Sequence, residues 1–251
     1  MIIKSISKYF YINKFTYFFI VLCLLKASFK PVIFVSVLLV FHELGHFLTA
    51  FLFGVEVDKI YLYPFGGISK FYIPLNYSNL KEFIILLNGP LFQELIKNIL
   101  IVIFPTNSLI IISYHYSILI FNLLPIYPLD GGKLLNIIFS IFIPYKKSLK
   151  ISIYISYIAI LLLLLINLSS IKINCICMFS FLIYKVHKEY KLINRKYETL
   201  LLERYIRKYK FSKTKIITKI ENFYKSYRHL IKINDGYVLE ETFLKEKYEK
   251  K

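Results

Sequence analysis

The sequence predicts an all-α polytopic membrane protein, with about six transmembrane helices and a short interfacial β-hairpin, followed by a small cytosolic α+β module at the C-terminus. Three observations support this fold class. Hydrophobic residues make up 57% of the chain and the mean hydropathy is +0.57, which leaves too little polar surface for a soluble domain. Apolar runs of about 20 residues, the length that crosses a bilayer, recur along most of the chain. The last quarter is instead rich in Lys and Arg.

The apolar runs divide the first part of the chain into membrane segments and one exception. Residues 54–79 carry aromatic and β-branched side chains around Gly66 and Gly67, a pattern typical of two short strands about a turn. Because strand edges within the bilayer would be unpaired, this hairpin must lie at the interface or be shielded by protein. The six expected spans lie near residues 15–29, 32–53, 81–104, 108–126, 148–168 and 171–186.

The distribution of positive charge sets the expected orientation. With the N-terminus inside the cell, only Lys26, Lys30 and Lys172 fall outside, while the tail from Lys185 adds 19 Lys+Arg against 9 Asp+Glu on the cytosolic side. This bias follows the positive-inside rule and predicts a multi-pass protein with both termini in the cytosol. The net charge of +18 is better explained by contact with an anionic lipid bilayer than by nucleic acid, so no nucleic-acid partner is expected.

The composition changes near residue 186, and we expect two domains, residues 1–186 in the membrane and residues 187–251 in the cytosol. The second region contains the β-branched runs KIITKI and HLIKI, helical periodicity and an Asn-Asp-Gly turn. Strands and helices are expected to alternate in this basic module. A module of this size is marginally stable alone, so docking or self-association into a homo-oligomer is expected.

The segment FHELGH places chemically active side chains inside an apolar run. His42 and His46 are four residues apart, so on a helix both imidazoles can reach one cation. Glu43 stands beside the pair, where it can take a proton from an attacking water. Two alternatives remain: the pattern arises by chance in on the order of a few per cent of chains this long, and membrane histidines also bond to neighbouring helices. Zinc needs a third protein ligand, and Leu52 stands where the extended pattern has a third histidine.

Two other acids lie within the apolar segments. Glu94 precedes Lys97 by three residues and is interpreted as its partner on a helix. Asp130 ends the segment FNLLPIYPLD, whose two prolines exclude a regular helix, and the following two glycines relax backbone constraints. An acid at the margin of a membrane segment is costly, which favours a functional role as the third ligand. The alternative is a turn that caps a helix starting near Lys133.

The pair FHELGHFLTA and FNLLPIYPLDGGKLL resembles the two signatures of the site-2 proteases, the intramembrane zinc metalloproteases of peptidase family M50. The resemblance covers residues 30–145. It implies one zinc ion (Zn2+) bound by His42, His46 and Asp130, with Glu43 as the catalytic base. It also implies a packing role for the NGP segment at residues 88–90. The residues that it implies for engaging an extended substrate are Asn122, Pro125, Pro128, Gly66 and Gly67.

The spacing of the motifs resembles one branch of this family. His46 and Asp130 are 84 positions apart, which leaves no room for an inserted PDZ domain. Six spans followed by a cytosolic module are similar to the sporulation branch, which releases sigma-K from a membrane-associated precursor at the outer forespore membrane. In that branch the tail is a CBS domain implicated in ATP sensing, and membrane proteins inhibit the enzyme. The tail of this chain is short for a complete CBS domain, so we expect a truncated, CBS-like module and assign no residue to ATP.

The resemblance implies hydrolysis of a peptide bond in a membrane-associated protein of the bacterial cell membrane, with a sigma-factor precursor of the pro-sigma-K type as the expected substrate. An alternative substrate is another membrane-anchored regulator or a remnant peptide. A zinc transporter would explain the histidines and the aspartate but not Glu43, and the sequence shows no internal repeat. An inactive, protease-like scaffold would not need the full set of ligands and base.

Overall fold

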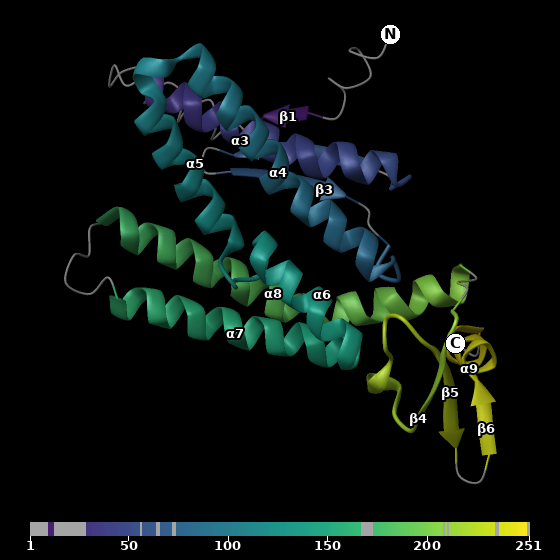
Figure 1. Ribbon diagram of the computed structural model, residues 1–251. Coiled ribbons are helices and arrows are strands. Elements are labelled where there is room, and N and C mark those ends of the chain that lie inside the picture. The colour runs from purple at the N-terminus through teal and green to yellow at the C-terminus, as the bar shows by residue number, and fades with distance from the viewer. Residues whose placement is uncertain are drawn as a thin grey trace. The chain divides into compact units, whose positions relative to one another are not determined.

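The computed structural model describes residues 10–12, 29–55, 57–63, 66–71, 74–166, 173–207, 209, 211–233 and 236–249 (Figure 1). The chain divides into two compact units, one of residues 1–73 and 80–121 and the other of residues 74–79 and 122–251. The first expected span, near residues 15–29, lies almost entirely outside the described residues.

Three helices form most of the first unit. They are apolar on nearly all sides, as expected of helices that are surrounded by lipid rather than water. Their shared core contains Phe34, Leu38, Ile96, Leu100 and Ile111, one or two from each helix. Large apolar side chains on the same helices remain exposed, which suits a lipid-facing surface. The helices are α3 (Phe29–Leu52), α4 (Asn79–Ile103) and α5 (Ser108–Leu123).

A three-stranded sheet completes the first unit. Its order is β1-β2-β3, with β1 parallel to β2 and β2 antiparallel to β3. Strands β2 and β3 both contact α3, which carries the two histidines. The strands are β1 (Phe10–Ile12), β2 (Val57–Tyr63) and β3 (Gly66–Phe71).

The predicted hairpin is therefore confirmed, but the expected position of its turn is wrong. Gly66 and Gly67 are the first two residues of β3, where they pair with Tyr63 and Leu62. The connection lies at residues 64 and 65, outside the described residues. The two glycines thus belong to the ladder that follows the turn.

The prediction of six spans is not confirmed. Among the described residues, three helices are long and apolar enough to cross a membrane. Helix α5, expected over residues 108–126, has only 16 residues and is about 24 Å long, short of a hydrocarbon core of about 30 Å. The last expected span lies in α8 (Ile173–Ile206), which continues well beyond residue 186. The three membrane-length segments are Pro31–Leu52, Asn79–Ile103 and Tyr145–Ile166.

The second unit contains α6 (Asp130–Phe142), α7 (Tyr145–Ile166) and α8. Helix α7 contacts both α6 and α8, and Figure 1 shows α7 and α8 side by side. Ser152 and Ser156 are buried on α7, and their hydroxyls donate to main-chain carbonyls one turn earlier. Small residues that satisfy their own polar groups allow neighbouring helices to approach closely.

The C-terminal module confirms the strands expected at KIITKI and HLIKI. The sheet order is β4-β5-β6, with β4 parallel to β5 and β5 antiparallel to β6. The expected alternation of strands and helices is wrong, because only a short 3-10 turn, Ile220–Asn222, lies between β4 and β5. The Asn-Asp part of the predicted turn lies outside the described residues. The elements are β4 (Thr214–Ile217), β5 (Arg228–Ile233), β6 (Gly236–Leu239) and α9 (Glu240–Glu249).

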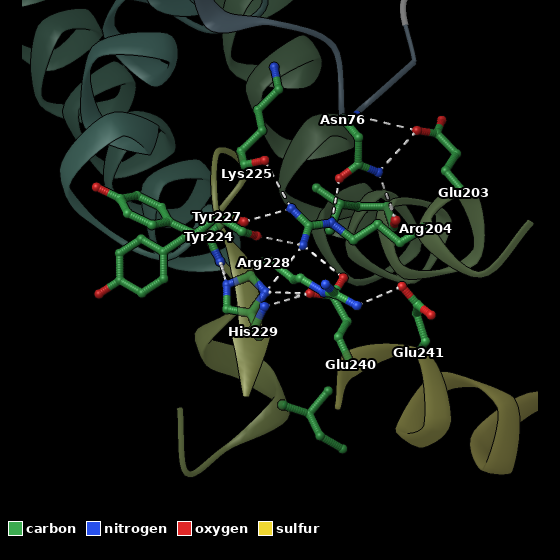
Figure 2. A network of polar contacts seen from close by, with 12 residues as sticks. Asn76, Glu203, Arg204, Tyr224, Lys225, Tyr227, Arg228, His229, Glu240 and Glu241 are labelled. Carbon is green, nitrogen blue, oxygen red and sulfur yellow. Dashed lines mark hydrogen bonds and ion pairs between the residues drawn. The ribbon is translucent and has the colours of Figure 1, made fainter. Parts of the chain in front are cut away.

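Arg204, near the end of α8, is the centre of a buried polar network in this module, as Figure 2 shows. A guanidinium group has five N–H donors, and Arg204 directs them to five acceptors. The side-chain acceptors are Oδ1 of Asn76 and Oε1 of Glu240, which lies 2.9 Å away. The other acceptors are the main-chain carbonyls of Tyr224, Lys225 and Tyr227.

His229 on β5 extends this network and is present as one neutral tautomer. Its Nε2 accepts a hydrogen bond from the main-chain N–H of Tyr224 at 2.9 Å, so the proton must lie on Nδ1. Nδ1 then donates to Oε2 of Glu240 at 2.9 Å. The 3.1 Å approach of an Arg204 nitrogen to Nδ1 is a close contact between donors rather than a hydrogen bond.

The same network fixes the loop that precedes α4. Asn76 lies in this loop, and its Nδ2 donates to the main-chain carbonyl of Leu200 at 2.9 Å. Its Oδ1 accepts from Arg204, and its main-chain N–H lies 3.3 Å from Oε2 of Glu203. The end of α8 therefore holds a segment that is separated from it by more than 120 positions in the chain.

Candidate metal centre

His46 is held in a single orientation by α4. Its Nδ1 lies 2.8 Å from the main-chain carbonyl oxygen of Ile85. Because a carbonyl oxygen can only accept, Nδ1 must carry the hydrogen, and Nε2 keeps its lone pair. His46 is 4% exposed, so this lone pair lies in a buried site. Metal-binding histidines in proteins are commonly fixed in this way.

His42 lies one turn earlier on α3 and is fixed by a side chain of α4. Its Nδ1 is 2.9 Å from Oε1 of Gln93, and both residues are buried. Gln93 in turn donates from Nε2 to the main-chain carbonyl of His115 on α5 at 3.0 Å. As with His46, the contact places the hydrogen on Nδ1, so Nε2 of His42 presents a lone pair.

The positions of the two Nε2 atoms point to a shared cation. Nε2 of His42 and Nε2 of His46 are 3.2 Å apart, and since both hydrogens lie on Nδ1, no hydrogen bond joins them. Two lone pairs at this distance repel each other unless a cation lies between them. Two nitrogens bound to one tetrahedral zinc ion at about 2.0–2.1 Å are about 3.3 Å apart. The spacing of the two imidazoles therefore fits zinc.

Close packing of α3 on α4 sets this geometry. A Cβ added to Gly45 would lie 2.3 Å from the main-chain oxygen of Asn88, so no larger residue fits there. A Cβ added to Gly89 would lie 2.4 Å from Nε2 of His46. The packing role expected for the NGP segment is thus confirmed for its glycine. Pro90 follows within α4, where it provides no N–H to the preceding turn.

Glu43 lies on α3 between the two histidines in sequence and is half-buried. Because the motif is helical, Glu43 lies one residue, about 100° around the helix axis, after His42. Helix α3 spans the whole motif without interruption, so the arrangement of His42 and His46 on one face, predicted from their spacing, is confirmed.

Asp130 is the first residue of α6 and is buried. The interpretation of a cap for a helix starting near Lys133 is wrong, because α6 starts at Asp130 and its N-cap residue is Leu129. The carboxylate instead lies 3.1 Å from the ammonium group of Lys133, one turn along the same helix. A negative charge in the first helical turn is also favoured by the helix dipole.

The loop before Asp130 is irregular, as its two prolines predict, and α5 ends at Leu123. The glycines after Asp130 allow close packing of α6 on the preceding loop rather than backbone freedom. A Cβ on Gly131 would lie 2.2 Å from the carbonyl oxygen of Leu123, and one on Gly132 would lie 2.4 Å from the nitrogen of Tyr127. The first turn of α6 therefore packs directly on the loop.

Tyr127 anchors this loop to two neighbouring helices. Its main-chain N–H donates to Oγ of Ser156 on α7 at 2.8 Å. Its hydroxyl accepts a hydrogen bond from Nζ of Lys196 on α8 at 3.0 Å, and Lys196 also pairs with Glu189. The position of Asp130 within its unit is thus set by side chains that are distant in sequence.

The sequence-predicted site residues fall in both units. His42, Glu43, His46 and the hairpin glycines belong to the first unit, whereas Asp130 and the loop residues Asn122, Pro125 and Pro128 belong to the second. Asn122 is in the last turn of α5, and both prolines lie in the irregular segment after it.

Sequence reasoning missed the residues that orient the histidines. Gln93, His115 and the carbonyl of Ile85 were not predicted as parts of the site. His115 is buried, with its Nε2 2.9 Å from Oε2 of Glu94 but without hydrogen-bond geometry. Glu94 also pairs with Lys97, as predicted. The one available signal was the spacing of four between Gly89 and Gln93, which places both on one face of α4.

The C-terminal module contains an open groove that is lined by both basic and acidic side chains. Two of its cations already have partners, because Arg204 pairs with Glu240 and Arg228 pairs with Glu241 at 2.9 Å. No residue of this module is assigned to ATP. The groove is lined by Arg204, Tyr205, Tyr209, Phe211, Arg228, Glu240, Glu241 and Lys245.

Comparisons with known proteins agree on one family. The sequence model of Peptidase family M50 matches residues 31–109 and 105–166. The chain is 31% identical over 203 residues to stage IV sporulation protein FB of Bacillus subtilis, covering 78% of this chain and 70% of that protein. It is 33% identical over 171 residues to a zinc metalloprotease of Methanocaldococcus jannaschii, covering 64% of this chain and about half (49%) of that protein.

A solved structure shows the same fold. The site-2 protease from Methanocaldococcus jannaschii matches with a TM-score of 0.55 and 28% sequence identity, over 72% of this chain and 89% of that chain. The family model covers more than half of the chain. The matched residues include His42 and His46 on α3 and also Asp130. The chain therefore belongs to peptidase family M50 and is a membrane-embedded zinc metalloprotease of the site-2 type.

Proposed function

We propose that His42, His46 and Asp130 bind one zinc ion and that Glu43 is the catalytic base for peptide hydrolysis within the membrane. The observation that carries this assignment is the pair of buried Nε2 atoms 3.2 Å apart, each left with its lone pair. Tetrahedral zinc at a catalytic site takes three protein ligands and leaves one position open. Asp130 supplies a buried carboxylate from a segment that the family model matches.

Zinc and the side chains of the protein have different roles in the proposed hydrolysis. When bound, zinc supplies Lewis-acid activation of a water molecule and of the scissile carbonyl. Glu43 accepts the proton of the attacking water and delivers it to the leaving amine, so one carboxylate acts as base and then as acid. Asn122 could donate a hydrogen bond to the developing oxyanion from the end of α5.

The substrate must be extended at the site, because a helix hides its carbonyl groups in its own hydrogen bonds. Among the described strands, β3 pairs only with β2 and so has a free edge. We propose that this edge, which begins at Gly66 and Gly67, receives the substrate by strand addition. Pro125 and Pro128 would keep the loop before Asp130 extended, so that it can engage the substrate.

We infer that the substrate is a membrane-associated sigma-factor precursor, of the pro-sigma-K type, and that the protein acts during sporulation at the outer forespore membrane. The similarity to stage IV sporulation protein FB supports this inference. The alternative is another membrane-anchored regulator or a remnant peptide. Inhibitory membrane proteins and self-association belong to the same proposal.

The proposed topology is multi-pass, with residues 1–186 in the membrane region and residues 187–251 in the cytosol, and with both ends of the chain on the cytosolic side. The lysine distribution supports it. A reporter fused after Lys251 should be inaccessible from outside intact cells, and labelling of that reporter by an impermeant reagent would refute this orientation.

The decisive experiment compares the wild type with Glu43→Gln. The variant should bind zinc like the wild type but fail to convert a co-expressed sigma-factor precursor to its shorter form on a gel. Glu82→Gln is the matched control, because it removes another carboxylate from the same unit, at the start of α4. A variant that still cleaves would remove the base assignment. Zinc-dependent cleavage by purified protein separates a protease from a transporter or an inactive scaffold.

A further inference from the structure

Gln93 is a buried amide between two helices, and its position suggests more than packing. It lies on α4 and has no exposed surface. An amide removed from water is costly unless its donors and acceptor are paired. Gln93 satisfies this requirement with one residue on each side, His42 on α3 and His115 on α5.

The contacts on α5 determine which way the amide faces. The main-chain carbonyl oxygen of His115 lies 3.0 Å from Nε2 of Gln93 and can only accept a hydrogen bond. The NH2 group must therefore face α5. Nδ1 of His115 lies 3.2 Å from the same nitrogen and can accept its second hydrogen. The carbonyl of the amide is then left to face α3, where Oε1 is 2.9 Å from Nδ1 of His42.

This orientation determines the tautomer of His42. Because Oε1 of Gln93 can only accept, the hydrogen of the neutral imidazole must lie on Nδ1, and Nε2 presents a lone pair. The opposite tautomer would place a hydrogen on Nε2, which could not bind a metal, and would leave two acceptors facing each other. For His46 the carbonyl of Ile85 has the same effect. Helix α4 thus orients both imidazoles.

We propose that Gln93 is a positioning residue that keeps His42 in its metal-binding tautomer and orientation. The inference rests on the proposed zinc ligands and adds a residue that the HELGH and LDGG motifs do not contain. Partners of this kind typically change metal affinity by about 10- to 100-fold when they are removed. The effect should appear in zinc binding itself, before any peptide is cleaved.

The test uses the full chain in detergent and measures zinc affinity by competition with a chromophoric chelator. Gln93→Met keeps the volume but removes the acceptor, and should bind zinc about 10- to 100-fold more weakly. Gln93→Asn keeps an amide that is too short to reach both neighbours, and should also bind weakly. Gln93→Glu retains an acceptor for Nδ1 of His42 but places a second acceptor against the main-chain carbonyl of His115, so it should bind zinc less tightly than the wild type and more tightly than Gln93→Met.

Glu94→Gln is the control, because Glu94 contacts His115 and Lys97 but makes none of the contacts to His42 described above. It should bind zinc like the wild type, and the absorption spectrum of its Co2+ form should be unchanged, whereas that of Gln93→Met should be altered. Gel filtration and thermal unfolding of the zinc-free proteins show whether each variant folds.

The outcomes separate this inference from the proposed function. If the wild type binds no zinc, or if His42→Ala binds it equally well, the proposed zinc site itself fails. If His42→Ala loses zinc while Gln93→Met and Gln93→Asn bind like the wild type, only the positioning role is overturned. A loss in Gln93→Glu as large as that in Gln93→Met would also overturn it, because an acceptor alone would then not suffice.

Discussion

Gly89 of α4 lies directly against the imidazole of His46, with the position of a Cβ only 2.4 Å from Nε2. This is the atom that would bind zinc in the proposed site. A methyl group at residue 89 would therefore overlap the imidazole ring of His46. The small size of this residue is a requirement of the site and not only of helix packing.

Gly89→Ala should displace His46 and lower zinc occupancy, with an overpacking cost of about 1–3 kcal/mol in the free energy of unfolding. Metal analysis and thermal unfolding of the purified protein measure the two effects. Gly236→Ala is the control, because the nearest atom to its Cβ would be 3.8 Å away. Full zinc occupancy in Gly89→Ala would show that His46 can bind from another position.

Ser156→Ala should loosen the loop that leads to Asp130. The change removes the acceptor of the Tyr127 main-chain N–H, and a buried donor without a partner costs about 1–3 kcal/mol. Zinc affinity and unfolding temperature should both fall. Ser152→Ala is the matched control. Ser152 is also buried on α7, and its hydroxyl likewise donates one turn back, but it is not the acceptor of the Tyr127 main-chain N–H. Equal behaviour of the two variants would contradict the anchoring role.

Arg204→Lys should destabilise the C-terminal module by on the order of 2–5 kcal/mol, because an ammonium group has three donors for the five acceptors that the guanidinium binds. Faster digestion of the tail by chymotrypsin in the otherwise intact protein would report the loss. Arg228→Lys is the control, since its ion pair with Glu241 is exposed and such pairs contribute about 0–1 kcal/mol. A tail equally protected in both variants would refute the central role of Arg204.

The module should lose stability as the pH falls below about 6.5. Burial lowers the pKa of His229, and the nearby charge of Arg204 lowers it further. Burial alone would raise the pKa of Glu240, but the hydrogen bond from His229 and the charge of Arg204 hold it below its ordinary value. In both cases the unfolded chain binds protons at a higher pH than the folded module does, so acidification favours unfolding.

Hydrogen exchange of the β5 amides, corrected for the intrinsic effect of pH, measures this dependence. Exchange should accelerate first as the pH falls from about 6.5, through His229, and again below about 4.5, through Glu240. His229→Gln should remove the first step and leave the second. Protection that stays constant or increases between neutral pH and about pH 5 would contradict the assignment of a neutral, buried His229.

Much of the candidate site could be predicted from local patterns. The spacing of His42 and His46 determines that they share a helical face, and two prolines in five positions determine that the segment before Asp130 is irregular. The contacts of Gly89 and Gln93 could not be predicted, because they depend on how α4 packs on α3 and α5. The spacing of four from Gly89 places Gln93 on the same helical face, but it does not identify a histidine 51 positions away as the partner of Gln93.

The fold was predictable to a similar extent. Helices α3, α4 and α7 follow from long apolar runs, and the two hairpin strands follow from β-branched and aromatic residues. The extension of α8 through the charged residues after Tyr184 was missed, because a change in composition was interpreted as a domain boundary. The network around Arg204 was also missed, since three of its five acceptors are main-chain carbonyls, which any residue type can provide.

The most direct test of the account is the zinc content of the purified protein compared with that of Asp130→Ala. We expect about one zinc ion per chain in the wild type and in Glu43→Gln, and a large loss of zinc together with all cleavage in Asp130→Ala. Wild-type protein without zinc, or an Asp130→Ala variant that retains both zinc and activity, would contradict the claim that the two motifs form one metal site.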